Sequence, residues 1–371
     1  MESENGSQSL LKKPESLFFA PMEPLTANPI LREIMVDFGA DILCRPKILP
    51  QHLLKAKKWQ FWERMQRQSQ KSTIDGIQLI ARPDDPIAAA VKFLNENSRA
   101  LDIKYIDLNF CCPGYKVLPQ RRGGELLKEP KTIIKVIEKV LKYSELPVSI
   151  KIRKGYTVKD NPTELLAKIH REFRSNISWI TVNRAPVKMH NVKMINVIND
   201  ITPFQQAVEA VEQQIPIIAN GGFIRPTQVL AIIRNLHLSG VMIGRGALGY
   251  PSFFQKILDL NKGNGKKIQL NEKERFIHGL RAFLEKIYYY ATHGQGRWTT
   301  LGELKRQLYP FIKFKYSSEK GGLPTGYGFD KWHKIKFSPS TFSKALAYIF
   351  PEFSSQFWLN WVNSLPFRQK K

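Results

Sequence analysis

Eight short apolar runs, each followed by a stretch with helical spacing, predict a parallel (β/α)8 barrel with a smaller helical domain behind it. Apolar runs that alternate with amphipathic helices are typical of βα units in a parallel sheet. Eight such units are the number that closes a TIM barrel. The runs lie at residues 17–22, 41–45, 76–80, 105–109, 147–152, 179–183, 216–220 and 240–244.

Proline opens three of the intervening stretches, at residues 86–97, 130–143 and 226–235. Proline suits the first turn of a helix because the N–H groups of that turn have no partner within the helix. We therefore expect helices there, a barrel over residues 17–257 and a flexible tail at residues 1–16. The chemistry of such a barrel sits where strands enter the loops of its C-terminal face.

A second, α-helical domain is expected over residues 265–371. The strand rhythm stops after the turn-rich residues 261–267. Helical spacing then appears at residues 272–291 and 301–315, and an aromatic, helical pattern returns at residues 349–367.

The chain is strongly basic, with 57 Lys and Arg against 32 Asp and Glu and a formal net charge of +25. Residues 255–371 contribute +13 of this excess, from 21 Lys and Arg against 8 Asp and Glu. Such an excess attracts polyanions over a long range, so nucleic acid is the first partner to consider. The alternative is a solvated, lysine-rich surface.

Other features limit the location and the chemistry. No apolar run reaches the ~18 to 20 residues that cross a bilayer, and the N-terminus lacks the apolar core of a signal peptide. The chain has three cysteines, Cys44, Cys111 and Cys112, without the CxxC spacing of a zinc site. We expect a cytoplasmic monomer with no membrane association, no metal and free thiols.

The end of the fourth run carries the strongest local signal. Asp107, Asn109 and two cysteines lie where a barrel strand enters its loop. A free thiol, with a pKa near ~8.5, stays mostly protonated at neutral pH and can donate a proton to a carbanion-like centre. Ordinary burial is the alternative, and we prefer it for Cys111. For Cys112 we expect a catalytic role, because a proline follows it and a glycine-rich return lies at residues 121–124.

Two further strand ends indicate an anionic ligand. The runs before Gly222 and Gly246 both end in glycine, and loops after strands seven and eight of TIM barrels commonly bind phosphate. Arg245 could add a bidentate contact, although simple tight turns are the alternative. Period-two alternation directs Lys151 and Arg153 to the barrel mouth. A reduced flavin could neutralise Lys151, as could an internal salt bridge to Asp107 or Asp41.

Together these residues resemble the FMN-dependent tRNA-dihydrouridine synthases over residues 17 to about 320. Asn109, Cys112, Pro113 and the glycine-rich return are similar to the family's Asn-x-Gly-Cys-Pro block, in which Cys112 matches the catalytic cysteine. The resemblance implies that FMN is held by Pro21, Met22, Gln78, Asn109, Lys151, Asn183, Asn220, Gly221, Gly222, Gly244, Arg245 and Gly246.

The resemblance also implies a reaction. FMN, reduced by NADPH, would pass a hydride from N5 to C6 of a tRNA uracil, while Cys112 protonates C5. The target base must leave the folded tRNA and stack on the flavin, which requires contacts that hold the RNA backbone. Substrate contacts are expected from Arg153, Arg184, Lys305, Arg306, Lys313 and Lys315.

The chain departs from the family after its sixth strand. Where the family has His-Gly-Arg, this chain has Asn183, Arg184 and Ala185. Asn183 can hydrogen-bond FMN but carries no charge, and Arg184 or Lys188 would have to replace the lost arginine. We therefore expect a divergent subgroup with altered position specificity.

Two other functions fit parts of the sequence. A flavin dehydrogenase of a free small molecule, similar to dihydroorotate dehydrogenase, would share the barrel, the lysine and the phosphate loops, but would not need the basic domain. A catalytically silent RNA-binding barrel would need none of Cys112, Lys151 and Asn109.

Overall fold

The computed structural model describes residues 10–11, 15–22, 29–55, 73–189, 194–247, 252–263, 340, 343, 347 and 354–364. Eight parallel strands form a closed barrel in chain order, β1 to β8, which confirms the predicted TIM barrel. Each predicted run overlaps one strand. The strands are β1 Ser16–Phe19, β2 Ile42–Ile48, β3 Ile74–Leu79, β4 Tyr105–Phe110, β5 Val148–Arg153, β6 Ile177–Asn183, β7 Ile217–Asn220 and β8 Gly240–Ile243.

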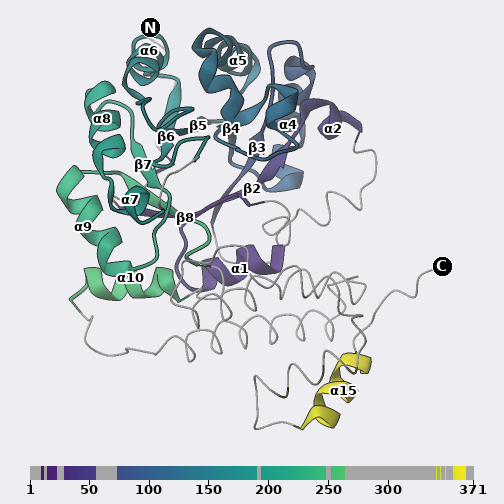
Figure 1. The fold of residues 1–371 in the computed structure, drawn as a ribbon. Coiled ribbons are helices and arrows are strands. Elements are labelled where there is room, and N and C mark those ends of the chain that lie inside the picture. Colours follow the sequence, from purple (N-terminus) through teal and green to yellow (C-terminus); the bar gives the residue numbers. More distant parts are fainter. Residues whose placement is uncertain are drawn as a thin grey trace, which may run out of the picture. The chain divides into compact units, whose positions relative to one another are not determined.

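Helices follow the strands as expected, and Figure 1 shows those between residues 87 and 236 outside the ring of strands. The predicted helix at residues 130–143 has those bounds in the structure. The helices are α1 Pro29–Asp37, α2 Pro50–Lys55, α4 Ile87–Leu101, α5 Pro130–Tyr143, α6 Thr163–Phe173, α7 Met194–Asn199, α8 Thr202–Ala210, α9 Pro226–Leu236, α10 Phe253–Asn261 and α15 Ser355–Ser364, with the 3-10 helices η2 Leu118–Gln120 and η3 Gly123–Lys128.

The chain divides into two compact units, one of Met1–Pro29 with Gly39–Arg245, the other of Ile30–Phe38 with Gly246–Lys371. All eight strands belong to the first unit. The helices predicted at residues 272–291 and 301–315 lie outside the described residues, while α15 falls within the helical pattern expected at residues 349–367. Among the described helices, none has the length and apolar character needed to cross a membrane.

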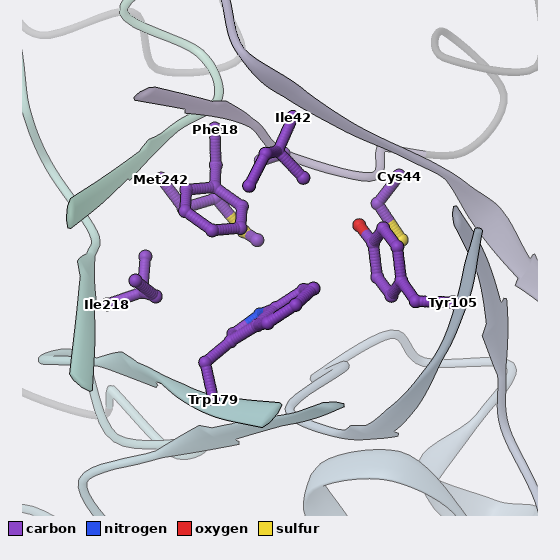
Figure 2. Close-up of a cluster of buried hydrophobic side chains, with 8 residues drawn as sticks. Phe18, Ile42, Cys44, Tyr105, Trp179, Ile218 and Met242 are labelled. Atoms are coloured by element: carbon purple, nitrogen blue, oxygen red, sulfur yellow. The ribbon is translucent and has the colours of Figure 1, made fainter. Parts of the chain in front are cut away.

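An apolar cluster fills the barrel near the beginnings of the strands. Trp179 lies between Tyr105 and Phe18, with ring centroids 4.7 Å and 5.5 Å away, both edge to face (Figure 2). The hydroxyl of Tyr105 donates to the carbonyl of Leu43 at 2.7 Å, so its buried polar atom is satisfied. Gly76 makes room for this ring, because a Cβ there would lie 2.3 Å from it. The cluster comprises Phe18, Ala20, Ile42, Cys44, Tyr105, Trp179, Ile218 and Met242.

A buried ion pair joins β2 to β3, and its arginine also reaches the end of α4. Arg45 and Asp75 are fully buried and lie 3.0 Å apart, and Arg45 also donates to the carbonyl of Leu101 at 2.5 Å. The carbonyl belongs to the last turn of α4, where a cation stabilises the unsatisfied acceptors. One arginine thus joins a strand, its neighbour and a helix end.

We predict that Asp75→Asn lowers the free energy of unfolding by about 3–5 kcal/mol, because it leaves a buried guanidinium without its counter-charge. The matched control is Asp102→Asn, which breaks the exposed pair between Lys104 and Asp102. That change should cost less than about 1 kcal/mol. Urea unfolding followed by far-UV circular dichroism measures both, and equal losses would contradict the prediction.

Candidate active site

A layer of polar side chains lies above the apolar cluster, toward the ends of the strands. On β4, Tyr105 belongs to the apolar cluster, and the period-two alternation of a strand turns Asp107 and Asn109 to the same interior side. Buried polar groups must find hydrogen-bond partners within the protein. The buried members of this layer are Gln78, Asp107, Asn109, Ser149, Lys151 and Asn220.

Hydrogen bonds that begin at the carboxylate of Asp107 join strands β3, β4 and β5. Ser149 Oγ donates to one oxygen of Asp107 at 2.7 Å, and Gln78 Nε2 donates to the other at 2.6 Å. Asn109 Nδ2 then donates to Gln78 Oε1 at 2.6 Å. Burial raises the pKa of Asp107, whereas these hydrogen bonds and the charge of Lys151 act against the rise.

This series of hydrogen bonds ends at the loop that carries the cysteines. Asn109 Oδ1 accepts hydrogen bonds from the backbone N–H groups of Cys111 at 3.0 Å and Cys112 at 2.9 Å. The Cys112 carbonyl accepts from the N–H of Gly124 at 3.0 Å. Gly123 has φ +59, and a Cβ there would lie 3.0 Å from the same carbonyl. The loop therefore holds Cys112 half-buried, while Cys111 is buried.

The glycine-rich return is itself fixed to neighbouring loops. The guanidinium of Arg122 binds both carboxylate oxygens of Asp85, in the loop after β3, with Nη2 2.7 Å from Oδ1. A Cβ on Gly124 would lie 2.7 Å from Val187, in the loop after β6. These loops touch only because residue 124 has no side chain.

Lys151 lies at the same end of the barrel as Cys112, on the next strand. Its ammonium donates to Asn220 Oδ1 at 2.7 Å, and Asn183 Nδ2 donates to the same oxygen at 2.7 Å. Within the described part of the chain Lys151 forms no ion pair, so the alternative salt bridge to Asp107 or Asp41 is not seen. Its positive charge is buried against neutral amides.

The glycines at the ends of β7 and β8 lie where a side chain would not fit. Gly221 has φ +108 and Gly222 φ +68, and a Cβ on Gly222 would lie 2.2 Å from Ile198. At the end of β8, a Cβ on Gly244 would lie 3.2 Å from the sulfur of Met22. The structure thus brings Met22 and Gly244 together, although they are far apart in the sequence.

Arg184 occupies a different place from the one expected. It is 1% exposed, and its guanidinium donates to the carbonyls of Gly221 at 2.7 Å and Ile198 at 2.5 Å. The rings of Phe204 and Phe223 lie 5.2 Å and 4.7 Å from its centre, and burial lowers its pKa to about 10. This position does not fit substrate contact. Arg184 instead supports the glycine loop from inside, because tertiary structure brings it carbonyl partners that the sequence could not reveal.

Two other arginines lie close together at this end of the barrel. Arg153 donates to the carbonyls of Cys111 at 2.7 Å and Pro186 at 2.9 Å, and so joins the loops after β4 and β6. Arg245 follows the end of β8, where only part of its side chain is exposed to solvent. Partial burial and the nearby charge of Arg153 lower the pKa of Arg245. Neither forms an ion pair with any described residue.

Sequence reasoning missed one exposed aromatic. Tyr115, in the cysteine loop, is 81% exposed, with the amine of Lys116 5.7 Å from its ring centre. Its place three residues after Cys112 was the available signal. No group of three or more potential metal ligands was found among the described residues. The expected tRNA contacts Lys305, Arg306, Lys313 and Lys315 lie outside those residues.

Comparison with known proteins gives the family. The model of the dihydrouridine synthase (Dus) family matches residues 18–315, which is most of the chain. A probable tRNA-dihydrouridine synthase of Rickettsia bellii (strain RML369-C) is 29% identical over 243 residues, 65% of this chain and 70% of that protein. The tRNA-dihydrouridine synthase B of Pasteurella multocida (strain Pm70) is 29% identical over 266 residues, 69% of this chain and 74% of that protein. A solved histamine dehydrogenase from Rhizobium sp. 4-9 has a TM-score of 0.47 and 11% identity over 73% of this chain and 48% of that one. The chain belongs to the dihydrouridine synthase family.

Proposed function

We propose that this protein reduces uridine to 5,6-dihydrouridine in tRNA, with FMN bound at the C-terminal face of the barrel and NADPH as electron donor. The family match and the names of the relatives support this activity. One observation carries the proposal. A half-buried thiol, Cys112, is held at the same end of the barrel as the buried cation of Lys151 and the glycines Gly221 and Gly222.

The residues at this end fit FMN. The buried ammonium of Lys151 donates to an amide oxygen and forms no ion pair with a described residue, which suits the electron-rich N1–C2=O edge of a flavin. The backbone of Gly221 and Gly222 can present N–H groups to a phosphate, as such turns commonly do. The remaining proposed contacts are Pro21, Met22, Gln78, Asn109, Asn183, Asn220, Gly244, Arg245 and Gly246.

FMN held by these residues would, once reduced by NADPH, supply the hydride that is added to C6 of the uracil. The protein supplies the proton. The thiol of Cys112 donates it to C5, which completes the reduction of the C5–C6 bond. Cys111 cannot take this part, because its side chain is buried and its carbonyl holds Arg153.

The tRNA must be held while its uridine leaves the folded structure. Cations of the C-terminal part, Lys305, Arg306, Lys313 and Lys315, are proposed to contact its phosphates, with residues 265–371 as a helical binding domain. Arg153 is proposed to contact the substrate at the barrel mouth. The Asn183 and Ala185 replacements point to a different uridine position from that of relatives with His-Gly-Arg.

Replacing the proton donor should separate flavin chemistry from uridine reduction. We expect Cys112→Ala to keep its flavin and its oxidation of NADPH by oxygen, but to reduce tRNA uridine about 10²- to 10⁴-fold more slowly, because only the acid is lost. Cys111→Ala is the matched control and should stay close to wild type. Dihydrouridine measured by mass spectrometry of tRNA from a deletion strain, complemented with each variant, tests the function and the assignment. Equal losses from both variants would refute the assignment.

The phosphate loop can be tested through flavin retention. Arg245→Ala should lose FMN during gel filtration, because a bidentate phosphate contact is removed. Arg171→Ala, which removes an exposed arginine from α6, is the control. Lys151→Ala should chiefly slow flavin reduction. Full flavin occupancy in Arg245→Ala, read from the visible spectrum, would disprove the phosphate contact.

Binding of tRNA should depend steeply on salt. Each neutralised phosphate contributes about −0.9 to the log–log slope for a duplex and about −0.7 for a single strand, because counterions are released. Lys305→Glu with Lys313→Glu should weaken binding and flatten the slope, while flavin content stays the same. Filter binding between low and moderate salt measures both quantities, and an unchanged slope would remove these lysines from the interface.

A further inference from the structure

Asp107 lies at the start of a hydrogen-bond chain with a defined direction. An ionised carboxylate can only accept hydrogen bonds. Its two oxygens take one from the hydroxyl of Ser149 and one from the amide nitrogen of Gln78. A carboxylate at this point therefore determines which end of the Gln78 amide faces it.

The direction passes from amide to amide. Because the Gln78 nitrogen faces Asp107, its oxygen faces Asn109 and accepts from Asn109 Nδ2 at 2.6 Å. The oxygen of Asn109 is then free to accept the two backbone N–H groups of the cysteine loop, at 3.0 Å and 2.9 Å. A reversed Asn109 would turn its NH₂ group toward two N–H donors, and both hydrogen bonds would be lost.

We propose that Asp107 is a positioning residue for the loop that carries Cys112. It touches neither the thiol nor the loop, and it acts only through Gln78 and Asn109. Its effect on the reaction rests on the proposed function, in which Cys112 is the proton donor. The holding of the loop is a separate property, which can be measured without turnover.

The reactivity of the Cys112 thiol reports on the loop. We replace Asp107 with leucine, which has a similar shape but accepts no hydrogen bond, in the full-length, flavin-bearing protein. In this variant either the Gln78 amide or the backbone of the loop keeps a buried N–H without an acceptor. The orientation that holds the loop is then no longer preferred, and the population of the released loop should rise by a factor of about five or more. Iodoacetamide should therefore alkylate Cys112 at least about five-fold faster than in wild type. Cys44, which is buried in the apolar cluster and away from this loop, serves as the internal reference in the same mass spectra.

A conservative variant separates direction from charge. Asp107→Asn can still accept from Gln78 while it donates to the hydroxyl of Ser149, so alkylation should stay within about two-fold of wild type. Adding Ser149→Ala removes that acceptor, and the double variant should react as fast as the leucine variant. Because both asparagine variants keep the shape of the site, the comparison remains decisive if Asp107→Leu does not fold.

Uridine reduction provides the second readout. Release of the loop should lower kcat in the leucine variant and the double variant while KM for tRNA stays near wild type, because the proton donor moves and the RNA contacts do not. The proposal would be overturned if iodoacetamide alkylated Cys112 at the wild-type rate in both the leucine variant and the double variant. It would also be overturned if the single variant Asp107→Asn reacted as fast as the leucine variant. Cys112→Ala could instead reduce uridine normally while the alkylation of Cys112 in the Asp107 variants follows the expected order. That result would refute the role of Cys112 as proton donor and leave the positioning role of Asp107 standing.

Discussion

The packing of Trp179 inside the barrel is the constraint on which the site depends. Its contacts with Tyr105 and Phe18 close the interior toward the beginnings of the strands. Side chains above this layer lie on an apolar floor, in an environment where unpaired polar atoms are costly and hydrogen bonds are strong. The polar residues of β3, β4, β5 and β7 therefore bind one another, and their network defines the site.

Much of the fold could be read from the sequence, because buried parallel strands are short apolar runs. The second run shows the limit. It was predicted to end at Arg45, but β2 continues to Ile48, with an irregular register between these two residues. Pro46 lies inside this segment and cannot donate to a strand ladder, so the pattern stops before the strand does.

The candidate site was only partly visible in the sequence, for a related reason. Period-two alternation gives the side to which a residue points, and Lys151 is buried in the barrel interior as predicted. It does not give the partner. The sequence left Lys151 between a flavin and a carboxylate, whereas its neighbour in space is Asn220, 69 residues away. The link from Asp107 to Gln78 spans 29 residues and was equally invisible.

The departure after β6 has a structural consequence that the family pattern alone would not indicate. The chain keeps an arginine there, but at Arg184, where it is buried beside two phenylalanine rings. Its charge is used on the carbonyls of Gly221 and Ile198, behind the glycine loop, and not at the barrel mouth. Asn183 meanwhile shares the Asn220 oxygen with Lys151, so a neutral amide completes the network. The two other arginines at this end, Arg153 and Arg245, lie close enough for the charge of Arg153 to help lower the pKa of Arg245, after the effect of desolvation.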